Sequence, residues 1–500
     1  MTISDTAPVR VTIRTTTHGE VYAAGRMTKT RTATPAVTML VSGDSGPTRQ
    51  LSSLDVQLLD NETPATPMSI GGVVMLQPED APLTLGALRR LFASRLHMIA
   101  PLRWRLRTVP LGLDLPYWDD SASIDLGFHV RETMFPDGAS DQDLADLVAR
   151  LHSSPLDRDR PLWECHLVTG LSGGRQALYM KVHHALIDGL SAAEIMAAIC
   201  DIVPDATPLP APVRGVRLNR TPELPEMLAR SAVNGIERQR NRIRALASSG
   251  PALLRTLPEL FKKHPDVPFN RTNTAGRSLA FASVPLADVK LVKQSVGGTV
   301  NDVVMTLCTA ALRRWLLAHD LPADRSLVAA VPVSVRTPEQ LGTAGNQFSI
   351  MFCDLPVDES EPRRRLNRLH DGLIEAKERF QTAPSTMMHE ATGMLTPLLN
   401  GAPTRVALRA AAAVLPFANT IVSNVPGPQI PLYVAGIRVT ASYPVSLLTD
   451  LSGGLNITVM SYDGHLDFGI LACADSIPDV GTIGEYLVEA LEELLAGIRA

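Results

Sequence analysis

A basic stretch punctuated by prolines divides this chain into two segments, and that division constrains the fold more than any other feature. Prolines gather at 204–212, and residues 206–275 contain 12 Lys and Arg against 5 Asp and Glu, a local net charge of +7. On both sides, short apolar runs alternate with helical spacing. Because 500 residues, 45% of them hydrophobic, exceed what one compact core usually holds, we expect two lobes.

Each lobe is predicted to have an α/β fold in which helices cover a mixed sheet. The predicted domains are a poorly ordered extension rich in Thr and Ser at 1–50, an N-terminal lobe at 51–205, a basic helical connector at 206–275 and a C-terminal lobe at 276–500. Helical spacing predicts the main helices at 85–98, 143–157, 191–203, 297–319, 361–380, 403–415 and 480–498.

Composition excludes several classes of protein. A net charge of −4 and a pI near 6.3 provide no basic field for nucleic acid. The five cysteines form no CxxC pair, which disfavours zinc ribbons and disulfide scaffolds and fits a reducing cytosol. No apolar leader is visible, and no run reaches the roughly 18–20 apolar residues of a membrane span. We therefore expect a cytoplasmic protein. The cysteines are Cys165, Cys200, Cys308, Cys353 and Cys473.

The stretch "KVHHALIDGLSA" at 181–192 carries the most chemistry, with paired histidines followed by an Asp-Gly bend. Neighbouring side chains on a strand point to opposite faces, so His183 and His184 cannot easily share one metal ion. No HExxH pattern or Cys/His cluster accompanies them, and no metal site is predicted. One ring can face a channel between the lobes while the other packs on the opposite side. Asp188 is expected to pair with a distant arginine and lock the bend, for which Gly189 supplies the backbone freedom.

Serine-nucleophile chemistry is the main alternative for this region. "GLSGG" at 170–174 matches GxSxG, but a nucleophile elbow needs a strand before it and a helix after it. Here a strand pattern follows, so Ser172 is predicted to lie in a hairpin turn. Ser191 is predicted to cap a helix together with Glu194.

The stretch "HHALIDG" resembles the HHxxxDG signature of coenzyme A-dependent acyltransferases and peptide-synthetase condensation domains. Further stretches, in order across 51–500, are similar to the bacterial wax ester synthase/diacylglycerol acyltransferase family. They are "LSSLDVQLLDNETPATPMSIGG", "PLDRDRPLWECHLVTGLSGGRQALYMKVHHALIDG", "GGTVNDVVMTLCTAALRRWL", "VPVSVR", "SNVPGP" and "SYDGHLDFGILACAD".

This resemblance implies a two-lobed fold like that of chloramphenicol acetyltransferase, with a channel between the lobes. It implies acyl-CoA as the donor, diacylglycerol or a long-chain alcohol as the acceptor, and no separate cofactor. It assigns His184 as the general base, with Asp188 and Gly189 shaping the site. The family's Asn-Asp pair falls on Asn301 and Asp302. Trp163 and the turn at 423–428 are carried over as packing features.

A histidine suits the work of a base here, because its reference pKa of about 6.5 leaves it mostly neutral in a cytosol. We expect His184 to take the acceptor's hydroxyl proton so that the oxygen attacks the thioester directly, without an acyl-enzyme. Asn301 is expected either to stabilise the oxyanion from the first turn of a helix or to serve only the structure of that helix start, and both interpretations stay open. For Asp302, a capping box with Thr299 is favoured over a chemical role.

The acceptors are insoluble in water, which predicts contact with a membrane or lipid-droplet surface. The connector is the candidate for that contact, although a solvated helix would have the same composition. Its arginines are Arg238, Arg240, Arg242 and Arg244, and its apolar residues include Ile236, Ile243, Leu246, Leu253 and Leu257. Two alternative functions stay open: acylation of another alcohol, on a polyketide or a peptide, and a degenerate module that only binds acyl-CoA or lipid.

Overall fold

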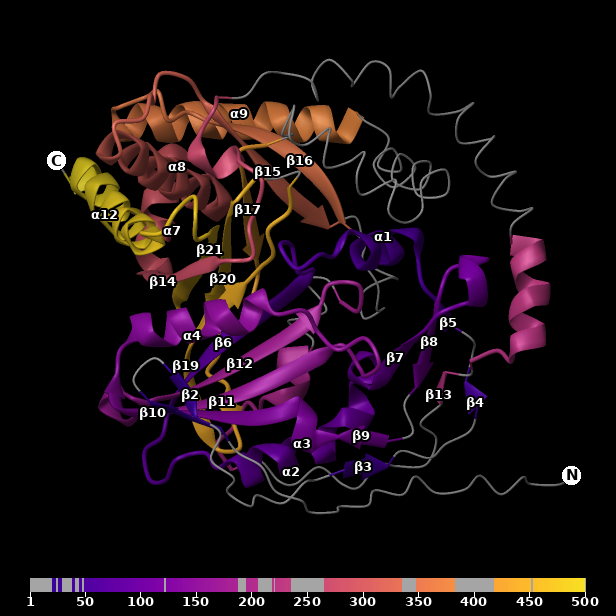
Figure 1. Cartoon of the computed structure of the whole chain (residues 1–500). Coiled ribbons are helices and arrows are strands. Elements are labelled where there is room, and N and C mark those ends of the chain that lie inside the picture. The colour runs from indigo at the N-terminus through magenta and orange to yellow at the C-terminus, as the bar shows by residue number, and fades with distance from the viewer. Residues whose placement is uncertain are drawn as a thin grey trace, which may run out of the picture.

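The computed structural model describes residues 20–23, 26–28, 38–40, 45–46, 49–120, 123–187, 195–205, 218–219, 221–234, 265–334, 348–382, 418–450 and 453–499. These residues form two lobes, each built on a large mixed sheet, as the sequence predicts (Figure 1).

The first sheet has eight strands and belongs mainly to the N-terminal lobe. Pairing is antiparallel from β18 through β11, parallel from β11 through β10 to β1, and antiparallel between β1 and β2. The last two strands come from the segment 1–50, which was predicted to be poorly ordered. In spatial order the strands are β18 (Tyr433–Val434), β19 (Ile437–Val445), β6 (Ser69–Gln77), β12 (Gln176–His183), β11 (Trp163–Leu171), β10 (Val130–Ala139), β1 (Glu20–Ala23) and β2 (Arg26–Thr28).

Helices cover both faces of this sheet. One face packs against α2, and the other packs against α4, which lies between the two sheets and contacts β14 (Figure 1). The helices of this lobe are α1 (Ser53–Asn61), α2 (Leu85–Arg95), α3 (Leu126–His129) and α4 (Asp141–Ser153). Short strands at its edge are β5 (Arg49–Gln50), β8 (Tyr117–Asp120), β7 (Trp104–Arg107), β3 (Thr38–Leu40), β9 (Ser123–Asp125), β4 (Ser45–Gly46) and β13 (Leu218–Asn219).

The second sheet has six strands, and helices α7, α8, α9 and α12 form the larger hydrophobic core with it. The strands, in spatial order, are β14 (Arg277–Pro285), β21 (His465–Cys473), β20 (Leu455–Tyr462), β17 (Thr420–Val425), β15 (Leu327–Ser334) and β16 (Phe348–Leu355). The helices are α7 (Leu286–Val296), α8 (Val300–Ala318), α9 (Pro362–Thr382) and α12 (Val480–Arg499).

Strand β19 corrects the predicted lobe boundary. It follows β17 of the second sheet in sequence, yet it pairs with β6 of the first sheet, with Tyr443 opposite Val73. Residues 433–445 therefore belong to the N-terminal sheet and not to a lobe that runs unbroken from 276 to 500. Strand β19 passes so close to β21 that β21 needs a glycine there, because a Cβ at Gly469 would overlap the carbonyl oxygen of Pro444 on β19.

Of the predicted connector, the structure describes 218–219, a helix that covers 224–234, and the residues from 265 onward. The connector arginines and the apolar residues from Ile236 to Leu257 lie outside the described residues, as does the whole helix predicted at 403–415. Among the described helices, none is long and apolar enough to span a membrane alone. The pair α7 and α8 passes that test only jointly, across a bend of 101°.

Candidate active site

Strands β12 and β6 lie side by side in the first sheet (Figure 1), and the paired histidines occur where β12 ends, beside the start of β6. His183 is the last residue of the strand, pairs with Ser69 and is fully buried. His184 begins the turn that follows, is half-buried, and donates its backbone N–H to the Met68 carbonyl at 2.8 Å. The two rings therefore have different surroundings, as predicted, although the reason differs: β12 ends at His183, so His184 lies in the turn and not on the strand.

The surroundings of His183 define which ring nitrogen carries its proton. The backbone N–H of Ala185 donates to its Nδ1 at 3.0 Å, so Nδ1 is an acceptor and the proton of the neutral ring is on Nε2. That Nε2 lies 3.6 Å from Oε1 of Glu62, the residue that ends α1. Since backbone on one side and a carboxylate on the other hold this ring, His183 is suited to a positioning role.

Glu62 is the buried centre of this network. It accepts a hydrogen bond from Arg158 at 2.8 Å on Oε2 and from the backbone N–H of Met68 at 3.3 Å on Oε1. Burial alone would raise the pKa of this carboxyl, but the polar contact with the His183 ring and the hydrogen bond and charge of Arg158 outweigh burial and lower the pKa to about 2. Glu62 is therefore an ionised group at neutral pH, beside the ring of His183.

Replacing this carboxylate is expected to destabilise the fold in a pH-dependent way. The pKa of Glu62 is lower in the folded chain than its ordinary value of 4.5, so its contribution is present above about pH 4.5 and is lost as the pH falls toward 2. Glu62→Gln should lower the free energy of unfolding by about 3 kcal/mol at neutral pH and by much less in acid. Urea unfolding across this range measures the effect.

Exposed Glu79 provides the matched control, because Glu79→Gln makes the same chemical change on the surface and should leave stability nearly unchanged. A difference between wild type and Glu62→Gln that did not shrink toward acid pH would contradict the assignment of Glu62 as a buried, paired carboxylate.

The rest of the motif is described only in part. Ala185, Leu186 and Ile187 are buried in the core on the α2 side of the sheet. Asp188 and Gly189 lie outside the described residues, so their predicted bend and ion pair stay predictions. The same holds for the helix cap predicted at Ser191.

Lys181, two residues before His183 and on the same face of β12, joins the strand to α4. Its Nζ donates to the carbonyls of Leu151 and Ser154, at 2.8 and 2.7 Å, at the end of the helix. Burial lowers the pKa of Lys181 to about 8, although the charge of Glu164 acts in the opposite direction. These hydrogen bonds thus attach the end of β12, just before the histidines, to the helix α4 that lies between the two sheets.

The start of α8 matches the capping box predicted for Asp302. Thr299 accepts from the backbone N–H of Asp302, and the Asp302 carboxylate accepts from the backbone N–H of Thr299 at 2.8 Å. His370 of α9 also contacts this carboxylate, with Nδ1 2.7 Å from Oδ2. All of these contacts hold the helix start, so the structure places Asp302 in a structural setting.

Asn301 lies in the first turn of the same helix and is half-buried. Its Oδ1 accepts from Nδ2 of Asn424 on β17 at 3.4 Å, which brings the "SNVPGP" segment to the Asn-Asp pair. Because its oxygen is the acceptor in this contact, the two N–H donors of the Asn301 amide point to its other side.

Comparison with known proteins decides the family. Residues 51–304 match the wax ester synthase/diacylglycerol acyltransferase catalytic domain, and residues 344–495 match the WS/DGAT C-terminal domain. The chain belongs to the wax ester synthase/diacylglycerol acyltransferase family. It is an acyltransferase.

Individual relatives span nearly the whole chain of this family member. A Mycobacterium tuberculosis protein (strain ATCC 25618 / H37Rv), named provisionally as a diacylglycerol O-acyltransferase, is 34% identical over 89% of this chain and 90% of its own length. The wax ester synthase/diacylglycerol acyltransferase from Marinobacter aquaeolei VT8 superposes with a TM-score of 0.68 at 29% identity, covering 90% of this chain and all of that one.

The two-lobed fold extends beyond the family. The first condensation domain of the calcium-dependent antibiotic synthetase superposes with a TM-score of 0.55 at 20% identity, over 91% of this chain and 98% of that domain. This likeness concerns the fold alone, and it agrees with the two-lobed architecture expected from the HHxxxDG signature.

Trp163 packs strands and helices of the WS/DGAT N-terminal lobe, as predicted. Its ring is fully buried and stacks on Phe92 and on His129, with centroids 5.3 and 4.5 Å apart. Its Nε1 donates to the Leu102 carbonyl at 2.7 Å. Trp163 is therefore a core residue that supports β11 next to β12.

The "SNVPGP" turn fits closely against β20. The backbone N–H of Gly427 donates to Oγ of Ser461 at 3.1 Å, and a Cβ at Gly427 would overlap the carbonyl oxygen of Ser461. Glycine is thus required here by close approach of two strands, and the approach fixes the end of β17 that presents Asn424 to Asn301.

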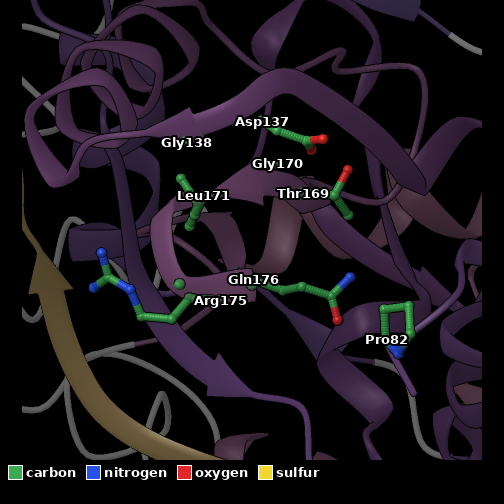
Figure 2. A pocket seen from close by; sticks show the side chains of 10 residues that line it. Pro82, Asp137, Gly138, Thr169, Gly170, Leu171, Arg175 and Gln176 are labelled. Carbon is green, nitrogen blue, oxygen red and sulfur yellow. The ribbon is translucent and has the colours of Figure 1, made fainter. Parts of the chain in front are cut away.

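Ser172 lies in the short turn between β11 and β12, where its Oγ accepts from Arg175 at 2.9 Å. The hairpin prediction is confirmed, and the strand that follows is not the helix that a nucleophile elbow requires. A hollow of about 330 Å³ lies at this turn. Figure 2 shows Thr169 and Gln176 among the residues that line it. Gln176 begins β12 and His183 ends it, so about 23 Å separates the hollow from the histidines.

Sequence reasoning missed Glu62, Arg158, Asn424 and His370. Glu62 and Arg158 occur in stretches that resemble the family, but no pattern pairs residues 96 positions apart. In the part of the chain that the structure describes, no group of His, Cys, Asp or Glu is arranged to hold a metal ion.

Proposed function

We propose that this acyltransferase transfers the acyl group of acyl-CoA to diacylglycerol, forming triacylglycerol, and to long-chain alcohols, forming wax esters. His184 is the general base. The observation that supports this most is the contrast within the pair: Glu62 and backbone hold His183 in the interior, whereas His184 lies half-buried in the turn after the strand.

The reaction proceeds by direct transfer. His184 accepts the hydroxyl proton as the acceptor oxygen bonds to the thioester carbon, giving a tetrahedral intermediate. The intermediate collapses when the carbon–sulfur bond breaks, and His184 returns the proton to the departing CoA thiolate. His183 positions the turn, and Asn301 donates its amide N–H to the oxyanion. The chain uses no cofactor, because acyl-CoA is itself a co-substrate.

Relatives support the substrates. The Mycobacterium tuberculosis relative is named for diacylglycerol acylation, and the Marinobacter aquaeolei relative for both diacylglycerol and wax ester chemistry. Since both acceptors are insoluble in water, we place the enzyme in the cytoplasm, at the surface of a membrane or lipid droplet.

A single-turnover experiment without acceptor tests direct transfer. Because no side chain takes the acyl group, the protein incubated with radiolabelled palmitoyl-CoA should carry no label after denaturation, and diolein added before quenching should become labelled triacylglycerol. Label that stayed on the denatured protein and then moved to diolein would demonstrate an acyl-enzyme and contradict the proposal.

A further inference from the structure

A helix over 224–234, the described part of the connector, has an apolar face that no part of the described chain covers. It lies at the outer edge of the N-terminal lobe, near β8 and β13 (Figure 1). Its inner face is anchored: Met227 packs with Val109 and Tyr117, and Asn234 donates to Asp114 at 2.7 Å. This helix and the adjoining turn over 110–113 together form what we name the apolar edge.

One side of the apolar edge is hydrophobic, while the ion pair between Arg230 and Glu226 lies on another part of the exposed helix surface. Positions 224, 228 and 232 follow one another at helical spacing, and positions 225, 229 and 233 lie beside them on the same side of the helix. The exposed large side chains are Leu224 (53%), Leu228 (43%), Val233 (58%), Leu111 (94%) and Leu113 (50%). Pro225, Ala229 and Ala232 complete the exposed face.

In the adjoining turn, Leu111 has an unusual backbone conformation. Its φ is +57°, a left-handed conformation that a branched, non-glycine residue adopts at a cost. Backbone hydrogen bonds from Gly112 to Val109 and from Leu113 to Pro110 hold the turn in this shape. The result is a fixed turn that keeps a leucine side chain in solvent beside a helix with the same character.

We propose that the apolar edge is the surface by which this enzyme binds lipid, with anionic headgroups contributing. Contiguous exposed apolar side chains are typical of an interfacial helix, which inserts them below the headgroups. Charge supports this partner, since residues 235–264, directly after the helix, contain seven Lys and Arg against two Asp and Glu. The choice of lipid over a second copy rests on the proposed function, because the acceptors dissolve only in lipid.

Vesicle co-sedimentation of the full-length chain tests this surface. The probes are vesicles of phosphatidylcholine alone and of equimolar phosphatidylcholine and phosphatidylglycerol. The triple variant Leu111→Ser, Leu228→Ser, Val233→Ser should lose at least about tenfold in vesicle affinity, because three side chains no longer insert. Wild type should bind the anionic vesicles more tightly, and salt should weaken that binding.

The matched control places the same change on the other lobe. Leu291, Leu317 and Ile374 are exposed to a similar degree on α7, α8 and α9, and serine at all three should leave vesicle binding unchanged. Equal binding by wild type and the Leu111/Leu228/Val233 variant would overturn the proposal. So would a wild type that is dimeric without lipid and becomes monomeric in that variant, because the apolar edge would then join two copies.

The binding assay is independent of turnover. If wild type bound vesicles through the apolar edge but esterified neither diolein nor a long-chain alcohol, the proposed function would fail and the surface would stand. If wild type esterified detergent-dispersed diolein but the three substitutions left vesicle binding unchanged, the proposed lipid-binding surface would be wrong and the proposed function would remain supported.

Discussion

His184→Ala is expected to lower kcat for diolein acylation by about 10²–10⁴-fold, the usual contribution of a positioned general base. The turn is held by backbone hydrogen bonds from His184 to Met68 and from Leu186 to His183, and the substitution leaves both in place. The variant should therefore fold as wild type does. A radiolabelled palmitoyl-CoA assay with diolein and with a long-chain alcohol measures the loss for both acceptors.

Two further variants separate base chemistry from packing. His184→Gln keeps a polar side chain of similar length but cannot take a proton at neutral pH, so it should be as inactive as the alanine variant. His465→Ala removes an exposed histidine at the start of β21 and should retain full activity. Turnover by His184→Ala or His184→Gln close to that of wild type would exclude His184 as the base, and it would equally exclude a module that only binds acyl-CoA or lipid.

The fold was predictable from sequence where the signal is local. The capping box at Thr299 and Asp302, the hairpin at Ser172 and the helix predicted at 480–498 all depend on neighbours within a few residues. The placement of β19 in the N-terminal sheet was not predictable. Its pattern shows an extended segment with one buried face, and nothing in that pattern distinguishes the edge of β6 from an edge in the second sheet.

The site divides in the same way. Strand alternation led to the expectation of different surroundings for His183 and His184, but it did not predict that the strand ends between them. The partners that create the difference come from distant segments, since α1 contributes Glu62 and the segment before β11 contributes Arg158. Pairings of this kind depend on how the elements assemble, and a single sequence does not encode them in any short pattern.

The second large effect is expected at Asn301. If its amide stabilises the oxyanion, Asn301→Ala should lower kcat about 10²–10³-fold, as for removal of one oxyanion-hole donor. The thermal midpoint should change little, because the helix start is held by Thr299 and Asp302 rather than by Asn301. Steady-state assays with diolein, together with thermal unfolding, measure the two quantities.

Asn301→Asp distinguishes chemistry from helix structure. Aspartate has the same shape, and a negative charge in the first turn of a helix is favourable, so a purely structural role predicts a variant that is stable and active. An oxyanion donor predicts the opposite. The carboxylate has no N–H to donate and repels the developing charge, so the aspartate variant should be stable and at least as inactive as Asn301→Ala. An active Asn301→Asp enzyme would therefore contradict a role for Asn301 in the reaction and assign it, like Asp302, to the structure of the helix start.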